Sequence, residues 1–216
     1  MEPIVAPAGP VPLELLEAVF EPGPARVLAV MVSSVDGRAT LQGRSGELGS
    51  DADRSVLAFL RACAQAILVG AGTARTEGYG PAEVRSPVLR ALRRRLGIPG
   101  DEVPISVVTR NERPIFAARA VALSQHADPE ELWRAAGAEP DRPGFLLVEG
   151  GPHVLGSLLA ARALDELSLT IAPLVVGSLE QALVPTELGA PIELAPVRLL
   201  VTPRELIWRL RIERSA

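Results

Sequence analysis

Apolar runs that alternate with helix-like segments are the feature that most restricts the fold of this chain. Candidate strands occupy residues 25–34, 66–72, 105–110, 119–125, 144–151 and 167–177. Segments with helical spacing of apolar residues occupy 53–64, 88–97, 129–137 and 153–164. A continuous apolar run is typical of a strand buried on both faces, as in a parallel sheet. The alternation therefore predicts an α/β fold with a mostly parallel central sheet flanked by helices.

The two ends of the chain depart from this pattern. Residues 197–214 read as two strands of alternating character joined at Thr202–Arg204, which predicts an antiparallel C-terminal hairpin. The first 25 residues are rich in Pro and Gly around one short amphipathic piece. We expect residues 1–25 to form an N-terminal arm laid on the surface of a single domain over residues 26–216.

Charge and composition exclude several functions. The net charge is −4, and the one dense basic run is Arg93–Arg95, so duplex nucleic acid is not an expected partner. Aromatic residues make up 3% of the chain, which weighs against recognition by base stacking. The sequence contains no lysine, so all 22 residues counted as Lys+Arg are arginines. Mechanisms that need a phosphate-binding or Schiff-base lysine are therefore excluded.

The cysteine content and the N-terminus bear on the compartment. Cys63 is the only cysteine, so the sequence predicts no internal disulfide and no thiolate metal site. Residues 1–10 lack the basic and apolar regions of a signal peptide, and no run of 18 apolar residues exists. We expect a cytoplasmic protein without a metal, a membrane or a nucleic acid as partner.

Small and polar residues follow four of the predicted strands at the point where each strand ends. The four ends read SSVDG at 33–37, VGAGT at 69–73, VTRN at 108–111 and VEGGP at 148–152. In an open α/β sheet, ligands bind beyond the carboxyl ends of the parallel strands. The convergence of these ends predicts a binding site at one edge of the sheet.

Two of the ends are suited to phosphate groups. Gly70 and Gly72 would let backbone N–H groups face a phosphate, and Thr73 can cap the following helix, although a tight strand-to-helix turn explains the glycines equally well. Thr109 and Arg110 pair a hydroxyl with a guanidinium, which suits a phosphate monoester. A solvated surface arginine is the competing interpretation of Arg110.

The other two ends combine bare main chain with carboxylates. Without side chains at Gly150 and Gly151, a flat ring or a pyrophosphate could lie against the backbone, and the next helix would begin with a positive dipole end. Asp36 ends the first strand on the same edge. It is either a turn residue or a carboxylate that faces a polar ligand.

These motifs, in the order in which they occur along the chain, resemble those of the reductase domain of riboflavin biosynthesis. The similarity runs from about residue 26 to 178 and rests on segments 31–50, 53–80, 107–110 and 146–177. In bacteria that domain is often the C-terminal half of a bifunctional deaminase–reductase, has the dihydrofolate-reductase-like fold and uses NADPH. Because no zinc-ligand motif of a deaminase is present, the chain resembles a stand-alone reductase. The resemblance further implies a homodimer formed through the late strands.

The resemblance implies hydride transfer from NADPH to C1 of the ribosylamine of 5-amino-6-(5-phosphoribosylamino)uracil. It assigns the following residues to NADPH: Gly70, Gly72, Thr73, Thr109, Arg110, Gly150, Gly151 and Pro152. Of these, Thr109 and Arg110 would bind the 2′-phosphate. Ser34 and Arg38 would bind substrate, and Asp36 and Glu149 are the catalytic candidates. Glu149 would hold the ribose or assist a proton transfer.

Alternatives remain open within this resemblance. The substrate could instead be another pteridine-like molecule or dihydrofolate, since substrate choice depends on the loops at 37–50 and 74–90. The segment 111–149 is shorter than its counterpart in the family and is expected to lack part of a strand–helix unit. That shortening suggests a third possibility, a nucleotide-binding protein without turnover. His153 either faces solvent at a helix start or contacts the cofactor phosphates.

Overall fold

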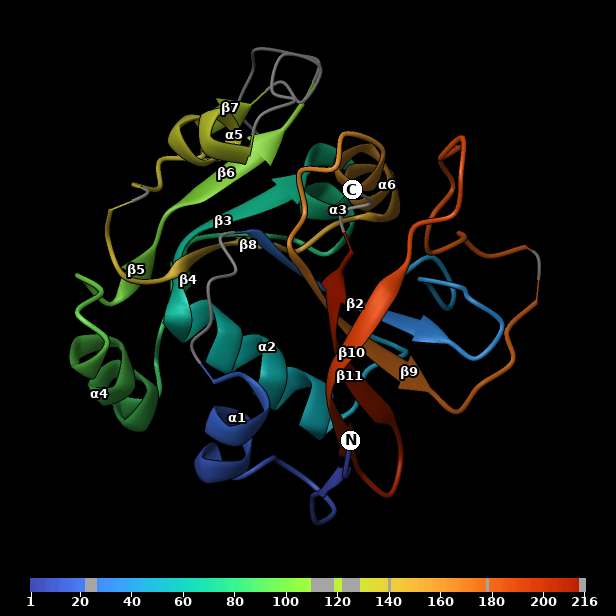
Figure 1. Cartoon of the computed structure of the whole chain (residues 1–216), viewed down its shortest axis with the longest axis horizontal. Helices are drawn as coiled ribbons and strands as arrows, with labels where there is room; N and C mark the ends of the chain where they lie inside the picture. The colour runs from blue at the N-terminus through green and yellow to red at the C-terminus, as the bar shows by residue number, and fades with distance from the viewer. Residues whose placement is uncertain (22–26, 110–118, 122–128, 140, 178, 214–216) are drawn as a thin grey trace.

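A nine-stranded sheet forms the centre of the computed structural model (Figure 1). The structure describes residues 1–21, 27–109, 119–121, 129–139, 141–177 and 179–213. The strand order is β1-β10-β11-β9-β2-β8-β3-β6-β7. Its strands are β1 (Ile4–Val5), β2 (Val27–Ser34), β3 (Ala64–Gly70), β6 (Ile105–Val108), β7 (Arg119–Val121), β8 (Phe145–Val148), β9 (Glu166–Ala172), β10 (Leu194–Val201) and β11 (Leu206–Ile212).

The central part of the sheet is parallel, as the apolar runs predict. β2 pairs in parallel with β8 and β9, β3 with β8 and β6, and β6 with β7. β11 runs antiparallel to both β9 and β10. The α/β class and the antiparallel C-terminal hairpin are therefore confirmed, with the hairpin beginning at Leu194. A separate two-stranded sheet joins β4 (Ala82–Glu83) to β5 (Glu102–Val103).

Helices cover both faces of the sheet. The helices are α1 (Leu13–Val19), α2 (Asp51–Cys63), α3 (Ala71–Thr76), α4 (Pro87–Arg95), α5 (Pro129–Ala135) and α6 (Pro152–Ala160). On one face α1 and α2 pack with Leu28 and Val30 of β2. On the other, α5 and α6 pack with Val27 and Ala29. Successive side chains of β2 thus pack on opposite faces of the sheet, because side chains alternate between the two faces along a strand. No helix in the described part of the chain has the length and apolar character of a membrane span.

The N-terminal segment joins the same core. Ile4 pairs with Leu200 at the edge of the sheet, and Leu16 and Val19 of α1 are buried against α2. Residues 1–21 therefore add an edge strand and a helix to the domain. The boundary at residue 25 stays a prediction.

The segment between β6 and β8 contains a strand and a helix. β7 extends the parallel sheet beside β6, and α5 buries Leu132 and Trp133 against the second core cluster. The predicted strand that begins at residue 119 and the predicted helix that begins at residue 129 are thus confirmed, while the expectation that 111–149 lacks part of the family's strand–helix unit stays a prediction. Arg110 and His126 lie outside the described residues.

Candidate functional site

A cavity of about 1520 Å³ lies beside the carboxyl ends of β3, β6 and β8. Strand ends contribute Gly70, Thr109, Glu149 and Gly151 to its wall, and helices contribute Asp53, Leu57, Thr73 and His153. Loop residues Thr40, Gly43, Ser45, Glu180 and Thr186 close the remaining side. Ligand pockets for one small molecule usually measure about 300–1,000 Å³, so this cavity has room for two ligands side by side.

Two strand ends meet at one corner of the cavity. The Gly70 N–H donates to the carbonyl oxygen of Gly150 at 2.6 Å, which joins the end of β3 to the end of β8. The peptide bond between Gly150 and Gly151 is cis. A Cβ added to Gly151 would collide with Thr73 Oγ1, and one added to Gly150 would lie 2.7 Å from Met31 Sδ. We call residues 149–151 the di-glycine corner.

The reason for the paired glycines therefore differs from the one expected. The atoms that forbid a Cβ at Gly150 and Gly151 belong to Met31 and Thr73, so the protein's own packing requires both glycines. Gly150 also has a φ of +73°, a backbone conformation that favours glycine. Among the four glycines assigned to NADPH, Gly72 is the one that leaves room for close ligand approach, because no atom lies within 4 Å of its Cβ direction.

The start of α6 provides an anion-binding feature in the cavity wall. Gly151 is the N-cap, Pro152 follows it, and no side chain caps the helix. The first N–H groups of a helix lack intrahelical partners, and together with the helix dipole they favour negative charge. The exposed His153 and the cavity-lining Ser157 stand in the same wall. This wall suits the phosphates of a dinucleotide.

Glu149 is held by two partners from distant parts of the chain. Arg61 Nε donates to its Oε1 at 2.7 Å and Arg61 Nη2 to its Oε2 at 2.6 Å. The Tyr79 hydroxyl donates to Oε2 at 2.6 Å. Burial, followed by the Glu149 charge, raises the pKa of Tyr79 far above its usual value, so this hydroxyl keeps its proton. Sequence reasoning missed Arg61 and Tyr79.

Asp53 of α2 is a further carboxylate in the cavity wall. It is partly buried, and Thr170 Oγ1 donates to its Oδ1 at 2.7 Å. Burial is the main cause that raises the pKa of Asp53 to about 6, and the charge of Glu205 adds to it. The Thr170 hydrogen bond and Arg54 act in the opposite direction. From the sequence, Asp53 is recognisable only as an acidic residue in the first turn of α2.

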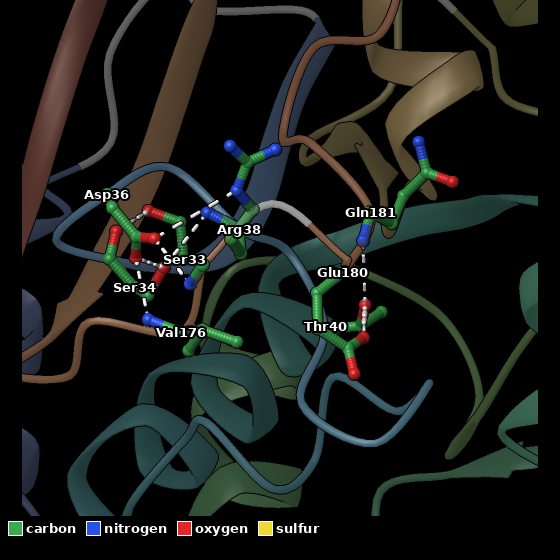
Figure 2. A network of polar contacts seen from close by, with 9 residues as sticks. Ser33, Ser34, Asp36, Arg38, Thr40, Val176, Glu180 and Gln181 are labelled. Carbon is green, nitrogen blue, oxygen red and sulfur yellow. Dashed lines mark hydrogen bonds and ion pairs between the residues drawn. The ribbon is translucent and has the colours of Figure 1, made fainter.

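Ser34, Asp36 and Arg38 lie in a neighbouring network and are not among the cavity-lining residues (Figure 2). Asp36 accepts hydrogen bonds from the Ser34 hydroxyl at 2.6 Å and from the Val176 and Gly177 amides at 3.0 and 2.7 Å. These bonds, led by the one from Ser34, hold the pKa of Asp36 well below its usual range. The network fastens the turn after β2 to the segment after β9. The catalytic and substrate-binding roles of these residues stay predictions.

The loop from Thr40 to Ser45 crosses the cavity between two glutamates. Thr40 Oγ1 donates to Glu180 Oε2 at 2.6 Å, as Figure 2 shows, and the Gly43 amide donates to the same oxygen at 3.2 Å. At the other end, the amide and hydroxyl of Ser45 donate to Glu77 Oε1 at 2.8 and 2.9 Å. Sequence reasoning identified this segment as an irregular loop without its anchors.

Comparisons with known proteins agree on one family. A model of the RibD C-terminal domain matches residues 25–207. The chain is 33% identical over 153 residues to the riboflavin biosynthesis protein RibD of Mycobacterium tuberculosis, an alignment that covers 67% of this chain. It covers 41% of that relative, so the chain spans well under half the length of the curated protein it matches.

Solved structures with the same fold include a pyrimidine reductase-like protein from Corynebacterium diphtheriae. It aligns with a TM-score of 0.76 at 22% identity and covers 93% of this chain and 99% of its own. Dihydrofolate reductase from Enterococcus faecalis, solved with NADP(H), aligns with a TM-score of 0.53 at 15% identity and covers 88% and 97%. The dihydrofolate-reductase-like fold implied by the sequence motifs is thus confirmed.

Proposed function

We propose that this chain, which belongs to the RibD C-terminal domain family, is an NADPH-dependent reductase acting on 5-amino-6-(5-phosphoribosylamino)uracil. One observation carries the proposal. One cavity of about 1520 Å³ is lined both by the phosphate-suited start of α6 and by the partly buried carboxyl of Asp53 from α2. Such a cavity suits a dinucleotide and a polar heterocycle lying against each other.

The cofactor half of the cavity is assigned to the strand ends. Gly70, Gly72 and Thr73 would hold NADPH from the β3–α3 side, and Gly151 and Pro152 from the β8–α6 side, with Gly150 behind them. Thr109 lines the cavity at the end of β6, which suits the proposed contact with the 2′-phosphate. The bound cofactor would supply the hydride. The open Cβ direction of Gly72 and the uncapped start of α6 support this assignment.

The substrate half is assigned to the wall formed by α2 and β2. Leu57 and Val30 give it an apolar surface on which a flat ring can pack, and Asp53 gives it one carboxyl group. A carboxyl with a pKa of about 6 is partly protonated near neutral pH, so Asp53 can donate a proton or a hydrogen bond to a ring nitrogen. We propose Asp53 as the proton-handling group of the site.

A second candidate is a reductase of dihydrofolate or a similar pteridine. The observation that favours it is the pairing of Asp53 with Thr170 beside the apolar Leu57, since a carboxyl at an apolar wall can recognise the amidine-like edge of a pteridine as well as the ring N–H donors of a uracil. Both candidates share the cofactor half of the cavity. They differ in the size of the ring and in the phosphate of the substrate.

A cytoplasmic location and a homodimer through β9–β11 belong to the same proposal. Beyond its pairing with the two-residue β1, the outer edge of β10 has no strand partner among the described residues. Leu194 on that strand is 39% exposed. An open edge with apolar side chains is suited to a second copy. Sedimentation should give twice the mass of the chain, and a monomer at micromolar concentration would contradict the dimer.

The proposed function is tested by binding and turnover of the purified protein. NADPH and NADH are titrated separately, and NADPH oxidation is then followed by absorbance with the phosphoribosylaminouracil and with dihydrofolate. We expect tighter binding of NADPH than of NADH, and oxidation with the phosphoribosylaminouracil. Oxidation with dihydrofolate alone would establish the second candidate. Tight NADPH binding without oxidation by either substrate would establish a non-catalytic nucleotide-binding protein.

A further inference from the structure

We infer that Arg61 and Tyr79 are positioning residues, which act through a fixed Glu149 to hold the di-glycine corner against the β3–α3 turn. In this inference Glu149 is itself a positioning residue and carries no proton in the reaction. The inference deepens the proposed function and rests on it for the identity of the cofactor. It assigns a role to three side chains that come from α2, from the segment after α3 and from the end of β8.

The hydrogen bonds of Glu149 leave it little freedom. Both carboxylate oxygens accept from the Arg61 fork, and Oε2 also accepts from Tyr79. The Arg61 guanidinium lies 5.7 Å from the centroid of the Tyr79 ring, so the two donors also contact each other. Bidentate pairing of a guanidinium with a carboxylate fixes orientation as well as charge. Three donors thus define one position for the carboxylate.

Burial makes this arrangement costly to change. The Glu149 side chain is 2% exposed, whereas that of Arg61 is 32% exposed. Removing one member of a buried ion pair leaves a charge without compensation, so loss of Arg61 would leave the Glu149 carboxylate buried without its counter-charge. A proton carrier has to exchange its proton with the substrate. Three of the roughly four acceptor positions of the Glu149 carboxylate are already occupied, which leaves Glu149 poorly placed for that exchange.

The contacts of the three residues close a ring around the corner. The Glu149 amide donates to Leu68 of β3 at 2.9 Å, and the Gly70 amide returns a bond of 2.6 Å to Gly150. From Gly70 the chain continues into α3, and the Tyr79 amide donates to the carbonyl of Ala74 at 2.9 Å. The Tyr79 hydroxyl then completes the ring at Glu149. A shift of Glu149 would therefore move both backbone walls that are assigned to the cofactor.

The test separates positioning from proton transfer with conservative variants. Arg61→Lys keeps the charge but removes the fork, and Tyr79→Phe keeps the ring but removes one hydrogen bond. The matched control is Arg142→Gln, because Arg142 pairs with Glu139 at 2.8 Å on the surface and its side chain is 55% exposed. For each protein we measure the NADPH dissociation constant by fluorescence, the Tm, KM, kcat and the pH profile of kcat.

We expect Arg61→Lys to raise the NADPH dissociation constant and KM about tenfold, because it removes a bidentate ion pair, and Tyr79→Phe about threefold, because it removes one charge-assisted hydrogen bond. The apparent pKa of the kcat profile should stay that of the parent in both variants and in Glu149→Gln. The control should match the parent in every measurement. A pH profile that loses its limb in Glu149→Gln, or unchanged NADPH binding in Arg61→Lys, would overturn the inference.

Failure of the proposed function is distinguishable from failure of this inference. A parent that binds NADPH but oxidises it with neither substrate refutes the proposed reaction, while the binding data still decide the positioning role. If the parent binds no NADPH, the positioning role is tested by comparing crystal structures of the parent and of Arg61→Lys. A di-glycine corner displaced in the variant supports the inference, and a superimposable corner refutes it.

Discussion

Asp53 of α2 and Thr170 of β9 lie face to face, with the Thr170 hydroxyl 2.7 Å from Asp53 Oδ1. Thr170 is fully buried, and its hydroxyl holds the carboxyl at the edge of the cavity. The two residues are 117 positions apart in the chain, so it is the packing of α2 on the sheet that brings them together. This contact places a titratable group of raised pKa beside the apolar substrate wall.

The raised pKa of Asp53 predicts how stability depends on pH. Its pKa is about 6 in the folded protein against 3.8 for an unperturbed aspartate, so the fold favours the protonated form. That contribution is present below about pH 4 and is lost as the pH rises through about 6. We expect Asp53→Asn to raise the unfolding free energy by about 1–2 kcal/mol at pH 7.5 and by almost nothing at pH 4. Urea unfolding at both pH values measures this.

The control for that experiment is Asp51→Asn. Asp51 lies in the same first turn of α2, but its side chain is 62% exposed and pairs with Arg54 on the surface. Its substitution should change stability by less than about 0.5 kcal/mol at either pH. Equal stability of Asp53→Asn and the parent at pH 7.5 would show that the fold does not raise the pKa of the Asp53 carboxyl.

Gly151 and Thr73 form the second test. Because a Cβ at Gly151 would collide with Thr73 Oγ1, Gly151→Ala should destabilise the fold by about 1–3 kcal/mol as well as weaken NADPH binding. The double variant Gly151→Ala with Thr73→Ala removes the colliding hydroxyl and should recover most of the lost stability. Thermal unfolding of the two single variants and the double variant measures the coupling. Additive effects would mean that the two residues do not share this contact.

Gly72 tests the approach of a ligand separately. Its Cβ direction is open, so Gly72→Val should leave the Tm within a few degrees of the parent and weaken NADPH binding by about tenfold or more. Gly80→Val is the matched control, because Gly80 also has an open Cβ direction but does not line the cavity. Isothermal titration of NADPH into both variants compares them. Parent-like binding by Gly72→Val would remove the β3–α3 turn from the cofactor half.

The fold was predictable from the sequence because strands that are buried on both faces appear in the sequence as continuous apolar runs. The strand ends were predictable for a related reason: parallel strands put their carboxyl ends on one edge, so Gly70, Thr109 and Glu149 had to be neighbours. The side chains that hydrogen-bond to these strand ends were not predictable. Arg61 and Tyr79 lie 88 and 70 positions from Glu149, and nothing in their local sequence indicates that partner.

Asp36 shows the same limit from the opposite direction. Its place at the end of β2 predicts a carboxylate that faces a ligand. In the structure the Asp36 carboxylate instead accepts hydrogen bonds from the amides of residues 176 and 177. Whether a strand-end carboxylate faces a ligand or a neighbouring loop depends on contacts across 140 positions of sequence. The paired glycines show the same limit. A side chain at Gly150 would collide with Met31 and one at Gly151 with Thr73, and neither contact can be read from the sequence.

The ion pair of Arg209 with Glu166 provides a test of how the N-terminal segment is attached. Arg209 of β11 donates to Glu166 of β9 at 2.7 and 3.0 Å, and both side chains are less than 10% exposed. Its Nη1 also donates to the carbonyls of Val19 and Glu21 at 3.3 and 2.9 Å, which ties the end of α1 to the sheet.

Arg209→Met should therefore cost about 3–5 kcal/mol, because it leaves Glu166 buried without a partner. It should also loosen residues 1–21, so limited proteolysis should remove them from the variant before the core is cut. Arg142→Met is the control and should behave as the parent, since the Arg142 side chain is 55% exposed and pairs with Glu139 on the surface. An N-terminal segment that stays protease-resistant in Arg209→Met would show that the packing of Leu16 and Val19 alone secures α1 to the domain.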